Sequence, residues 1–508
     1  RTATLHIASN DADENPFDLT VSGTGVGEVV PGALDALNGI GGRMTTPIGN
    51  SNDRVGGMAM QSDGKLLVAG YSFNGTNYDF ALARYGAGLY LDVAFGNAGV
   101  VTTPVGNSHD YGHSVAVQPD GKIVVAGNSL NASNSDIALA RYHVNGTLDT
   151  SFGNGGKVVT AFSGTSGETA WSVAVQPDGK IVVAGHTDNG TVNEDFALVR
   201  YNSDGSLDTA FGTGGKVTNA IGSDDDFGYS LTLQHDGKLV VAGQAKSSTG
   251  NDAFALARYL PNGALDPTFG TGGKVITPFG SSNSGGYSVA VQDDGKLLVA
   301  GHCSVGSTTE FDFALARYLP DGTLDSSFGS GGQVTTDLAH RSDDLGRSVV
   351  LQSDGKIVVA GSASGGANYD FALVRYLANG TLDAGFGHGG KMLTPISVSD
   401  DFGVSLVLQP DGKLVIAGDT RWADNYDFAL VGVLGTTTSE IAVEQPAGNN
   451  LTDGSAMVDF GSVALGGGPV VRTFTVRNAS TMMLTGLAVT KDGANAGDFT
   501  VGALTTTQ

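Results

Sequence analysis

The stretch from Trp171 to His186 reads W-S-V-A-V-Q-P-D-G-K-I-V-V-A-G-H, and it decides the fold of the chain. Val173 and Val175 alternate with small or polar residues, and a short apolar run begins at Ile181. Between them lies Q-P-D-G, a tight turn, because proline pre-sets φ at the second position of a type I turn and glycine takes the left-handed residue that follows. The stretch therefore predicts a β-hairpin.

The same hairpin motif occurs seven times in the sequence, at intervals of 57, 58, 58, 58, 60 and 57 residues. Self-similarity at such a period indicates a repeat architecture and not chance resemblance. In each copy a glutamine stands two residues ahead of an Asp-Gly-Lys, namely Gln61, Gln118, Gln176, Gln234, Gln292, Gln352 and Gln409.

Each unit reads, with variations, L-D-x-x-F-G-x-G-G-K-V-x-T, a polar loop, the hairpin, a second polar loop and D-F-A-L-x-R-Y. In the third copy this pattern predicts strands at 156–160, 172–176, 180–185 and 196–201. The chain has 78 glycines, which suit tight turns between short strands, and no long segment with a helical period. An all-β fold is therefore expected, with seven four-stranded antiparallel blades forming a β-propeller.

In unit length and motif order, residues 34–433 resemble the delta-60 repeat family. This resemblance implies a β-propeller within a large secreted or cell-surface bacterial protein, and it implies little about biochemical role. The array opens on the strand at 42–46 and closes on the strand at 428–433. We expect the ring to be closed by one strand from the N-terminal end and three from the C-terminal end, which leaves no exposed sheet edge.

Residues 1–25 and 441–508 lie outside the array, separated from it by linkers at 26–33 and 434–440. The motifs T-L-x-I-x-S-N-D and V-S-G-T-G of the first segment look like the closing half of an Ig-like sandwich of the choice-of-anchor D or ASPM–SPD-2–hydin class. The motifs D-F-G-S-V-A-L-G and R-T-F-T-V-R-N of the last segment look like its opening half. The strands expected here are 4–7, 17–21, 441–443, 456–460, 472–477 and 484–489.

The sequence leaves three arrangements of these halves open. They can pair within one chain, they can be completed by a neighbouring chain through strand donation, or they can be the cut ends of a longer tandem protein. The first residues already read as strand, so we expect an internal piece of a longer chain.

Composition excludes several classes of partner. A net charge of −24 argues against nucleic acid, whose phosphates require clustered lysine and arginine. Cys303 is the single cysteine, so no disulfide framework is expected. No apolar run is long enough to cross a bilayer, and membrane insertion is not expected.

Six carboxylates form the first candidate site, each eight residues before a hairpin glutamine and close to one mouth of the expected central channel. One interpretation is Ca²⁺ binding, since oxygen-rich loops suit that ion. The interpretation favoured here is that each carboxylate accepts backbone N–H groups of its own loop, because repetition in every blade is what a structural role predicts. The residues are Asp53, Asp110, Glu168, Asp226, Asp344 and Asp401, with Ser284 in the remaining copy.

A second acid opens the third strand of each unit, and an arginine follows five residues later in most units. We expect an inter-blade ion pair or a hydrogen bond to a backbone carbonyl, because arginine is often a structural choice. The acids are Asp79, Asp136, Asp195, Asp252, Asp312, Asp370 and Asp427. The arginines are Arg84, Arg141, Arg200, Arg258, Arg317 and Arg375, with Gly432 in the last unit.

His186 and His302 follow the hairpin's Ala-Gly at equivalent positions, where the other copies carry Tyr71, Asn128, Gln244, Ser362 and Asp419. No second ligand or nucleophile stands at a fixed spacing from either histidine, so a metal or general-base role is not expected. Polar loops with aromatic residues can bind glycans or be solvated turns, and the loops between second and third strands carry Tyr78, Tyr369, Trp422 and Tyr426.

These patterns favour a non-enzymatic structural or adhesive module that is extracellular or on the cell surface, and that can act as a filament subunit with other copies of the chain as partners. The alternative is a ligand-binding propeller that holds Ca²⁺ or a glycan at its acidic mouth. A specific ligand site should break the repeat symmetry, and no unique polar cluster is expected from the sequence.

Overall fold

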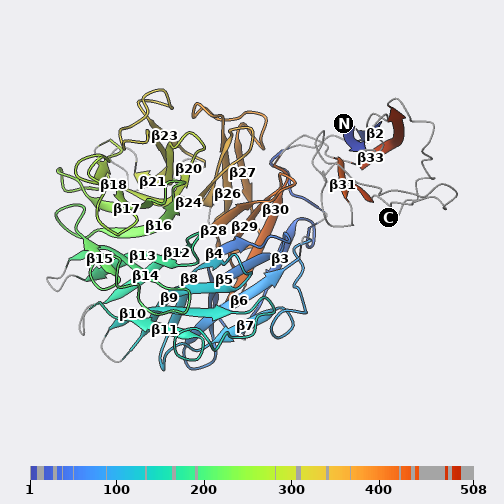
Figure 1. The fold of residues 1–508 in the computed structure, drawn as a ribbon. Coiled ribbons are helices and arrows are strands. Elements are labelled where there is room, and N and C mark those ends of the chain that lie inside the picture. Colours follow the sequence, from blue (N-terminus) through green and yellow to red (C-terminus); the bar gives the residue numbers. More distant parts are fainter. Residues whose placement is uncertain are drawn as a thin grey trace, which may run out of the picture. The chain divides into compact units, whose positions relative to one another are not determined.

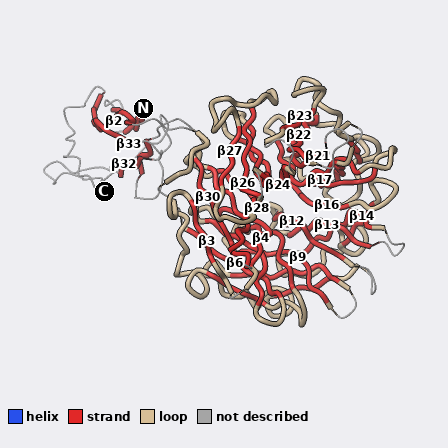
Figure 2. The backbone as a smooth tube through the Cα atoms, turned by 180° about the vertical axis from the view of Figure 1, so that it is seen from behind, coloured by secondary structure: helices blue, strands red, loops and turns tan. Residues whose placement is uncertain are grey.

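The computed structural model describes residues 2–7, 17–26, 31–36, 38–49, 51–86, 88–131, 134–162, 167–188, 193–280, 282–304, 310–338, 343–365, 368–422, 425–435, 441–444, 475–478 and 483–492. The regular secondary structure of these ranges is all β-strand (Figure 2). They contain no helix long and apolar enough to cross a membrane. The chain divides into two compact units, Gly32–Val433 and a second one made of Arg1–Pro31 with Leu434–Gln508.

The larger unit is a β-propeller of seven four-stranded antiparallel sheets (Figure 1). We number the blades by their innermost strands in chain order. Each innermost strand contacts those of the two neighbouring blades, so that the seven innermost strands ring the propeller axis. The expected propeller is confirmed.

The two inner strands of each blade form the repeated hairpin. The innermost strands are β4 (Asp53–Met60), β8 (Asp110–Val117), β12 (Glu168–Val175), β16 (Phe227–Leu233), β20 (Ser284–Val291), β24 (Asp344–Leu351) and β28 (Asp401–Leu408). The second strands are β5 (Leu66–Phe73), β9 (Ile123–Leu130), β13 (Ile181–Asp188), β17 (Leu239–Lys246), β21 (Leu297–Ser304), β25 (Ile357–Ser364) and β29 (Leu414–Trp422).

The two outer strands carry the D-F-A-L-x-R-Y and G-K-V-x-T motifs. The third strands are β6 (Tyr78–Tyr85), β10 (Ser135–Tyr142), β14 (Glu194–Tyr201), β18 (Asp252–Tyr259), β22 (Phe311–Tyr318), β26 (Tyr369–Tyr376) and β30 (Asn425–Val433). The outermost strands are β7 (Val100–Thr103), β11 (Lys157–Thr160), β15 (Lys216–Asn219), β19 (Lys274–Thr277), β23 (Gln333–Thr336), β27 (Lys391–Thr394) and β3 (Arg43–Thr46).

The seventh blade closes the ring as the sequence predicts. Its strand order is β28-β29-β30-β3, three strands from the end of the array and one from its beginning. β3 pairs antiparallel with β30, with Arg43 opposite Val431 and Thr46 opposite Phe428. Both free edges of an open array are thereby paired.

The hairpin turn has the expected geometry. Gly179 adopts φ +82°, and its N–H donates to the carbonyl of Gln176 at 2.9 Å. The N–H of Gln176 in turn donates to the carbonyl of Lys180 at 2.8 Å. A side chain at Gly179 would be strained at this positive φ, which explains the turn's glycine.

In the third blade the innermost strand begins at Glu168, four residues earlier than expected, because it contains a β-bulge, as do the other six innermost strands. In β12 the ladder slips between Ala170 and Ser172, which leaves Trp171 as the extra residue. A bulge breaks the alternation by which strands are recognised. It also brings backbones close together: a Cβ on Gly185 would lie 1.8 Å from the carbonyl oxygen of Thr169.

The core of the propeller lies between blades. Phe196 and Leu198 of β14, for example, pack with Leu239 and Val241 of β17 in the next blade. Buried tyrosines also cross the junctions, as where the Tyr201 hydroxyl donates to Thr160 Oγ1 at 2.9 Å. Each apolar core is therefore shared by two neighbouring blades.

The smaller unit contains β1 (Thr2–Ile7), β2 (Phe17–Val26) and β33 (Met483–Asp492) in one antiparallel sheet, and β31 (Ile441–Glu444) paired with β32 (Thr475–Asn478). Since β2 pairs with β33, the two terminal segments meet here within one chain. The strand expected at 456–460 lies outside the described residues, and the Ig-like class of these segments stays a prediction.

Candidate functional site

The six carboxylates singled out from the sequence stand at the start of innermost strands in six different blades. We call this side of the propeller, where the innermost strands begin, the acidic face. All six side chains are buried, and the residues are Asp53, Asp110, Glu168, Asp226, Asp344 and Asp401.

Backbone N–H groups of the preceding loop bind the five aspartates of this set, and the Thr187 hydroxyl donates to Glu168 Oε1 at 3.4 Å. Asp226 Oδ2 accepts the N–H of Ile221 at 2.6 Å and the N–H of Gly222 at 3.0 Å. Equivalent bonds of 2.6–2.7 Å run from Ile48 to Asp53, from Val105 to Asp110, from Leu338 to Asp344 and from Ile396 to Asp401. These are the bonds that the structural interpretation predicts, and the metal interpretation stays a prediction.

The fold brings the two sets of acids together in pairs across blade junctions: an acid that opens the third strand of one blade lies near the carboxylate that precedes the hairpin of the next blade. Burial raises the pKa of Asp226 to about 6, with the charge of Asp195 in the preceding blade as a further cause. Burial, with the charge of Asp79, likewise raises the pKa of Asp110. Carboxylates that face one another across a junction repel, so each such pair favours holding a proton.

The junction between blades five and six adds a third carboxylate. One carboxylate oxygen from each of Asp312, Asp337 and Asp344 lies within 4.8 Å of the others. Burial raises the pKa of Asp312, and the charges of Asp337 and Glu310 act in the same direction. Among the residues that the structure describes, this is the single group with the spacing of a cation site.

A serine on each innermost strand from the second blade to the seventh forms an inter-blade bond with the backbone of the next blade. Ser172 Oγ accepts the N–H of Leu231 at 3.1 Å. Bonds of 3.1–3.2 Å from Val173 to Ser114, Val289 to Ser230, Val349 to Ser288, Leu406 to Ser348 and Met58 to Ser405 repeat it. Gly57 has no hydroxyl, so the first blade lacks this bond.

The third-strand arginines hold neighbouring blades together through a backbone carbonyl, as one of the two expectations has it. Arg200 Nη1 donates to the carbonyl of Pro261 in the next blade at 2.5 Å. The expected inter-blade ion pair is wrong: Arg200 Nε binds Asp208 at 2.7 Å, in the loop after the same strand. The guanidinium carbon also lies 4.4 Å from the ring centroid of Phe211. Six blades share the ion pair and the ring contact, with ion pairs Arg84–Asp92, Arg141–Asp149, Arg200–Asp208, Arg258–Asp266, Arg317–Asp325 and Arg375–Asp383.

The bulge position of the innermost strand breaks the repeat symmetry. It directly precedes the inter-blade serine, and five blades carry a large ring or cation there. We call these five partly buried residues the axial belt: His113, Trp171, Tyr229, Tyr287 and Arg347. Gly56 and Val404 occupy the position in the first and seventh blades.

The axial belt is continuous from blade two to blade six. The ring centroids of His113 and Trp171 are 4.4 Å apart, and those of Trp171 and Tyr229 are 5.8 Å apart. Tyr229 stacks on Tyr287 at 4.6 Å with an interplanar angle of 14°. The guanidinium carbon of Arg347 lies 4.4 Å from the Tyr287 centroid. Every one of these contacts crosses a blade junction.

The second strands supply polar side chains behind the axial belt, from the position directly after Ala-Gly. Trp171 Nε1 donates to His186 Nδ1 at 3.3 Å, and His113 Nε2 lies 2.8 Å from Asn128 Oδ1. The His302 ring stacks on Tyr287 with centroids 4.7 Å apart.

These histidines are neutral at physiological pH. Burial lowers the pKa of His113 and the pKa of His186 to about 4. Burial, with the charge of Arg347, lowers the pKa of His302 to about 3. Each ring therefore offers one donor and one acceptor to its neighbours.

A partly buried ion pair crosses the junction between blades seven and one. Asp419 Oδ2 accepts from Arg54 Nη1 at 3.2 Å, and Asp419 Oδ1 accepts the N–H of Val55 at 2.6 Å. The Arg54 guanidinium carbon lies 3.4 Å from the centroid of Tyr426. Burial raises the pKa of Asp419 to about 7, although Arg54 acts against the shift.

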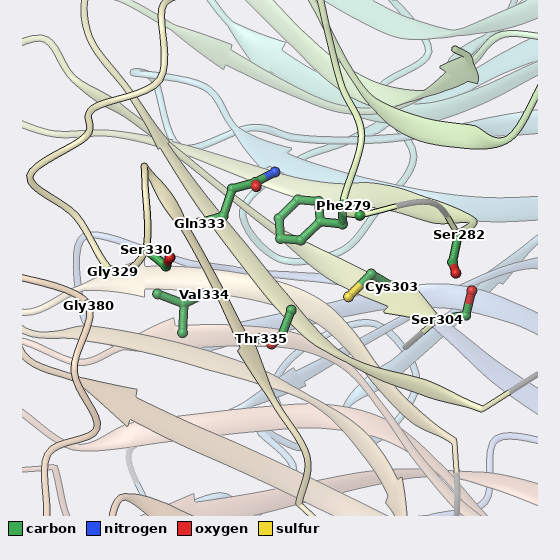
Figure 3. Close-up of a pocket in the computed structure, with 11 residues that line it drawn as sticks. Phe279, Ser282, Cys303, Ser304, Gly329, Ser330, Gln333, Val334, Thr335 and Gly380 are labelled. Carbon is green, nitrogen blue, oxygen red and sulfur yellow. The ribbon is translucent and has the colours of Figure 1, made fainter. Parts of the chain in front are cut away.

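A separate pocket of about 570 Å³ lies at the outer part of blade five, lined also by the segment that connects blades four and five and by Gly380 of blade six. Figure 3 shows Phe279, Cys303, Val334 and Thr335 around it. Burial raises the pKa of the Cys303 thiol to about 12, so this thiol stays protonated and is a poor nucleophile. We regard the axial belt as the stronger candidate, because it combines rings, polar partners and a cation.

Sequence reasoning expected no cluster that breaks the symmetry, and the axial belt contradicts that expectation. The histidines were noted from the sequence, but their neighbours at the bulge position were not. The sequence does contain a signal: the residue directly before the inter-blade serine is a large ring or an arginine in five successive blades, whereas the first and seventh blades have Gly56 and Val404 there.

The fold and its sites define the chain as a β-propeller repeat protein. Its repeats match the family described as "Domain of unknown function (DUF5122) beta-propeller" at residues 61–95, 118–152, 176–211, 234–269, 292–328, 352–386 and 409–431. Residues 156–193 also match "WD domain, G-beta repeat". Both matches support a β-propeller family, and the delta-60 name stays a prediction. No curated protein matches the chain.

Several solved structures are similar at low identity. One is a catalytically inactive virginiamycin B lyase from Staphylococcus aureus, at 12% identity and a TM-score of 0.44, covering 77% of this chain and 98% of that one. Another is a polysaccharide lyase described as an ulvan lyase, at 12% identity and a TM-score of 0.42, covering 80% of this chain and 96% of that one. Drosophila plexin A in complex with a semaphorin has 10% identity and a TM-score of 0.40, covering 81% and 88%. These similarities carry no argument about activity.

Proposed function

We propose that this protein is a non-enzymatic, ligand-binding β-propeller whose axial belt binds a carbohydrate. The observation that carries the proposal is the continuous run of rings from His113 to Tyr287 at the bulge position of four neighbouring blades. A scaffold role alone needs no such run, because the first and seventh blades pack with Gly56 and Val404 at this position.

The chemistry of the axial belt suits a sugar. A sugar ring presents a face of C–H groups that packs on an aromatic ring, and its hydroxyls need hydrogen-bonding partners at the edges. Binding sites in general combine apolar and aromatic walls with a few placed polar groups. Here Trp171 and Tyr229 offer rings, and Asn128, Gln244 and Ser362 stand among the second-strand residues behind them.

The titratable groups support binding in preference to acid–base catalysis. The three histidines have pKa values lowered by burial to about 3 or 4, and burial raises the pKa of Tyr71 to about 12. General acids and bases work best with a pKa near the working pH. Asp419, with a pKa of about 7, is held by Arg54 and by the N–H of Val55.

A glycan array probed with the intact chain, followed by calorimetry on the ligands it finds, tests the proposal. W171A and Y229A should weaken binding at least tenfold, because each removes a ring from the middle of the axial belt. W422A is the matched control, since Trp422 is 67% exposed at the end of β29, on the acidic face and outside the axial belt. Failure to bind any glycan, or equal binding by W171A and the unaltered protein, would overturn it.

A second candidate function is a structural or adhesive module of an extracellular or cell-surface protein. The repeated inter-blade bonds of Ser172 and Arg200 and their equivalents favour a rigid body, and the pairing of β2 with β33 shows a sheet built from both ends of the chain. Electron microscopy of native material tests it: end-to-end polymers would support a filament subunit, and isolated discs would oppose it.

A further inference from the structure

We propose that the carbohydrate bound by the axial belt carries a carboxylate, and that Arg347 is the residue that binds it. This inference rests on the proposed function and adds the charge and the recognition residue of the ligand. It starts from the one charged member of the axial belt.

Unlike Arg54 and the six third-strand arginines, Arg347 has no carboxylate partner among the described residues. The third-strand arginines bind an aspartate of their own blade, with Nε–Oδ2 distances of 2.7–3.0 Å, and Arg54 binds Asp419. Within the described ranges of the chain, Arg347 makes no ion pair: its guanidinium carbon lies 4.4 Å from the ring centroid of Tyr287, and Arg347 also forms a hydrogen bond with the Tyr287 side chain. A partly buried cation without a counter-charge is costly, and a ligand anion would relieve that cost.

The neighbours of Arg347 supply no anion either. Burial raises the pKa of both Tyr229 and Tyr287, so the phenols stay neutral. His302 is neutral as well. The charge of Asp252 contributes to the raised pKa of both tyrosines, but Asp252 forms an ion pair with Lys246, with Nζ and Oδ1 2.9 Å apart. The charge of Arg347 is therefore available to a bound molecule.

Geometry favours a planar anion. A guanidinium that stacks on a ring keeps its N–H donors in its own plane, where they match the two oxygens of a carboxylate. The Tyr287 ring beneath Arg347 also stacks on Tyr229, so a sugar packed on these rings can place a carboxylate against the guanidinium.

The surrounding charge limits how many anionic groups the ligand carries. The chain has a net charge of −24, and carboxylates line the blade junctions of the acidic face. A polyanion would be repelled by this field, whereas one carboxylate beside Arg347 meets a local cation. We therefore expect an isolated uronate within an otherwise neutral oligosaccharide.

Calorimetry on the intact chain tests the inference with an oligosaccharide that contains one uronate and with its carboxyl-reduced form. The unaltered protein should bind the uronate at least tenfold more tightly than the reduced form. R347Q should bind both forms with the affinity that the unaltered protein has for the reduced form, and R347K should keep part of the preference. R421Q is the matched control, because Arg421 also lies near an aromatic ring, 5.9 Å from the Tyr426 centroid, outside the axial belt.

The outcomes separate this inference from the proposed function. Equal binding of both forms by the unaltered protein, with loss of both in W171A, would overturn the inference and leave carbohydrate binding intact. Persistence of the uronate preference in R347Q, or a tighter fit for a sulfated analogue, would also overturn it. Absence of binding to every form would overturn the proposed function itself. Melting curves of each variant confirm that it folds.

Discussion

The ring of Tyr229 stacks on the ring of Tyr287 with centroids 4.6 Å apart, although the two residues belong to different blades and are 58 positions apart in the chain. Both stand at the bulge of an innermost strand, next to serines that bind the backbone of the next blade. The bulge and the serine that follows it thus recur along the array. The serine holds the next blade, and the bulge presents a side chain toward its neighbours in the axial belt.

The pKa values of His113 and His186 predict an acid transition in the fluorescence of Trp171. The chain has two tryptophans, so W422F isolates Trp171. Since both histidines have a pKa of about 4, protonation of His186 should break its bond from Trp171 Nε1 near pH 4. Emission should change with a midpoint near 4. A midpoint near the ordinary histidine value of 6.5 would contradict the buried geometry, and H113N with H186Q should remove the transition.

Removal of an inter-blade serine bond should destabilise the propeller. In S172A the N–H of Leu231 loses its acceptor, and an unsatisfied buried donor costs about 1–3 kcal/mol. Urea unfolding should shift to lower concentration for S172A. S203A is the control, because the Ser203 side chain is exposed on a turn. An equal midpoint for S172A and the unaltered chain would show that the bond does not stabilise the junction.

Breaking the arginine arrangement should cost more than removing a serine. R200Q leaves Asp208 with Lys180 as its remaining cationic partner and removes the bond to Pro261, and the loss of one partner of a buried ion pair costs up to about 3–5 kcal/mol. R200K should lie between, since lysine keeps the charge and loses the planar fork. Thermal melts of R200Q, D208N and the double variant measure the coupling, and additive effects would contradict a direct Arg200–Asp208 interaction.

The same pair predicts part of the acid denaturation. The bond from Lys180 is the first cause that lowers the pKa of Asp208, and the charge of Arg200 adds to it. A carboxylate with a lowered folded pKa stabilises the protein above its unfolded value of 3.8 and loses that contribution as the pH falls through its folded pKa. The melting temperature of D208N should therefore fall less on acidification below about pH 4 than that of the unaltered chain.

Asp226 should have the opposite pH dependence. Burial raises its pKa to about 6, so the folded state binds this proton more tightly, and stability is lost as the pH rises from 3.8 through 6. D226N keeps an acceptor for Ile221 and removes the charge. The melting temperature of D226N relative to the unaltered chain should therefore be higher at pH 7 than at pH 4.5, and D226A should be less stable at both. A Ca²⁺-dependent rise in melting temperature that D226N abolishes would instead support the metal interpretation.

The sequence was enough to predict the propeller, its hairpins and its closure, because these depend on local turn chemistry and on counting strands at both ends. Gly179 at positive φ and β3 beside β30 both follow from such local patterns. The bulge at Trp171 was missed because it interrupts the period of two, and the innermost strand of the third blade was therefore expected to begin at Ser172 and not at Glu168.

The pairing of the two sets of acids needed the tertiary structure. Asp195 and Asp226 lie in neighbouring blades, and only the packing of one blade on the next puts their charges within reach of each other. The same holds for Asp312 and Asp344. The repeats direct attention to positions that carry the same residue in most blades. The bulge position occurs in every blade, but its residue type changes along the array.

The most direct test of the axial belt as the ligand site is the emission of Trp171 in W422F during titration with a glycan that the chain binds. Trp171 lies in the middle of the axial belt, between His113 and Tyr229. The proposal predicts a saturable change in emission with the same midpoint as the calorimetric titration. Calorimetric binding with no change in Trp171 emission would contradict it and would place the ligand elsewhere on the propeller.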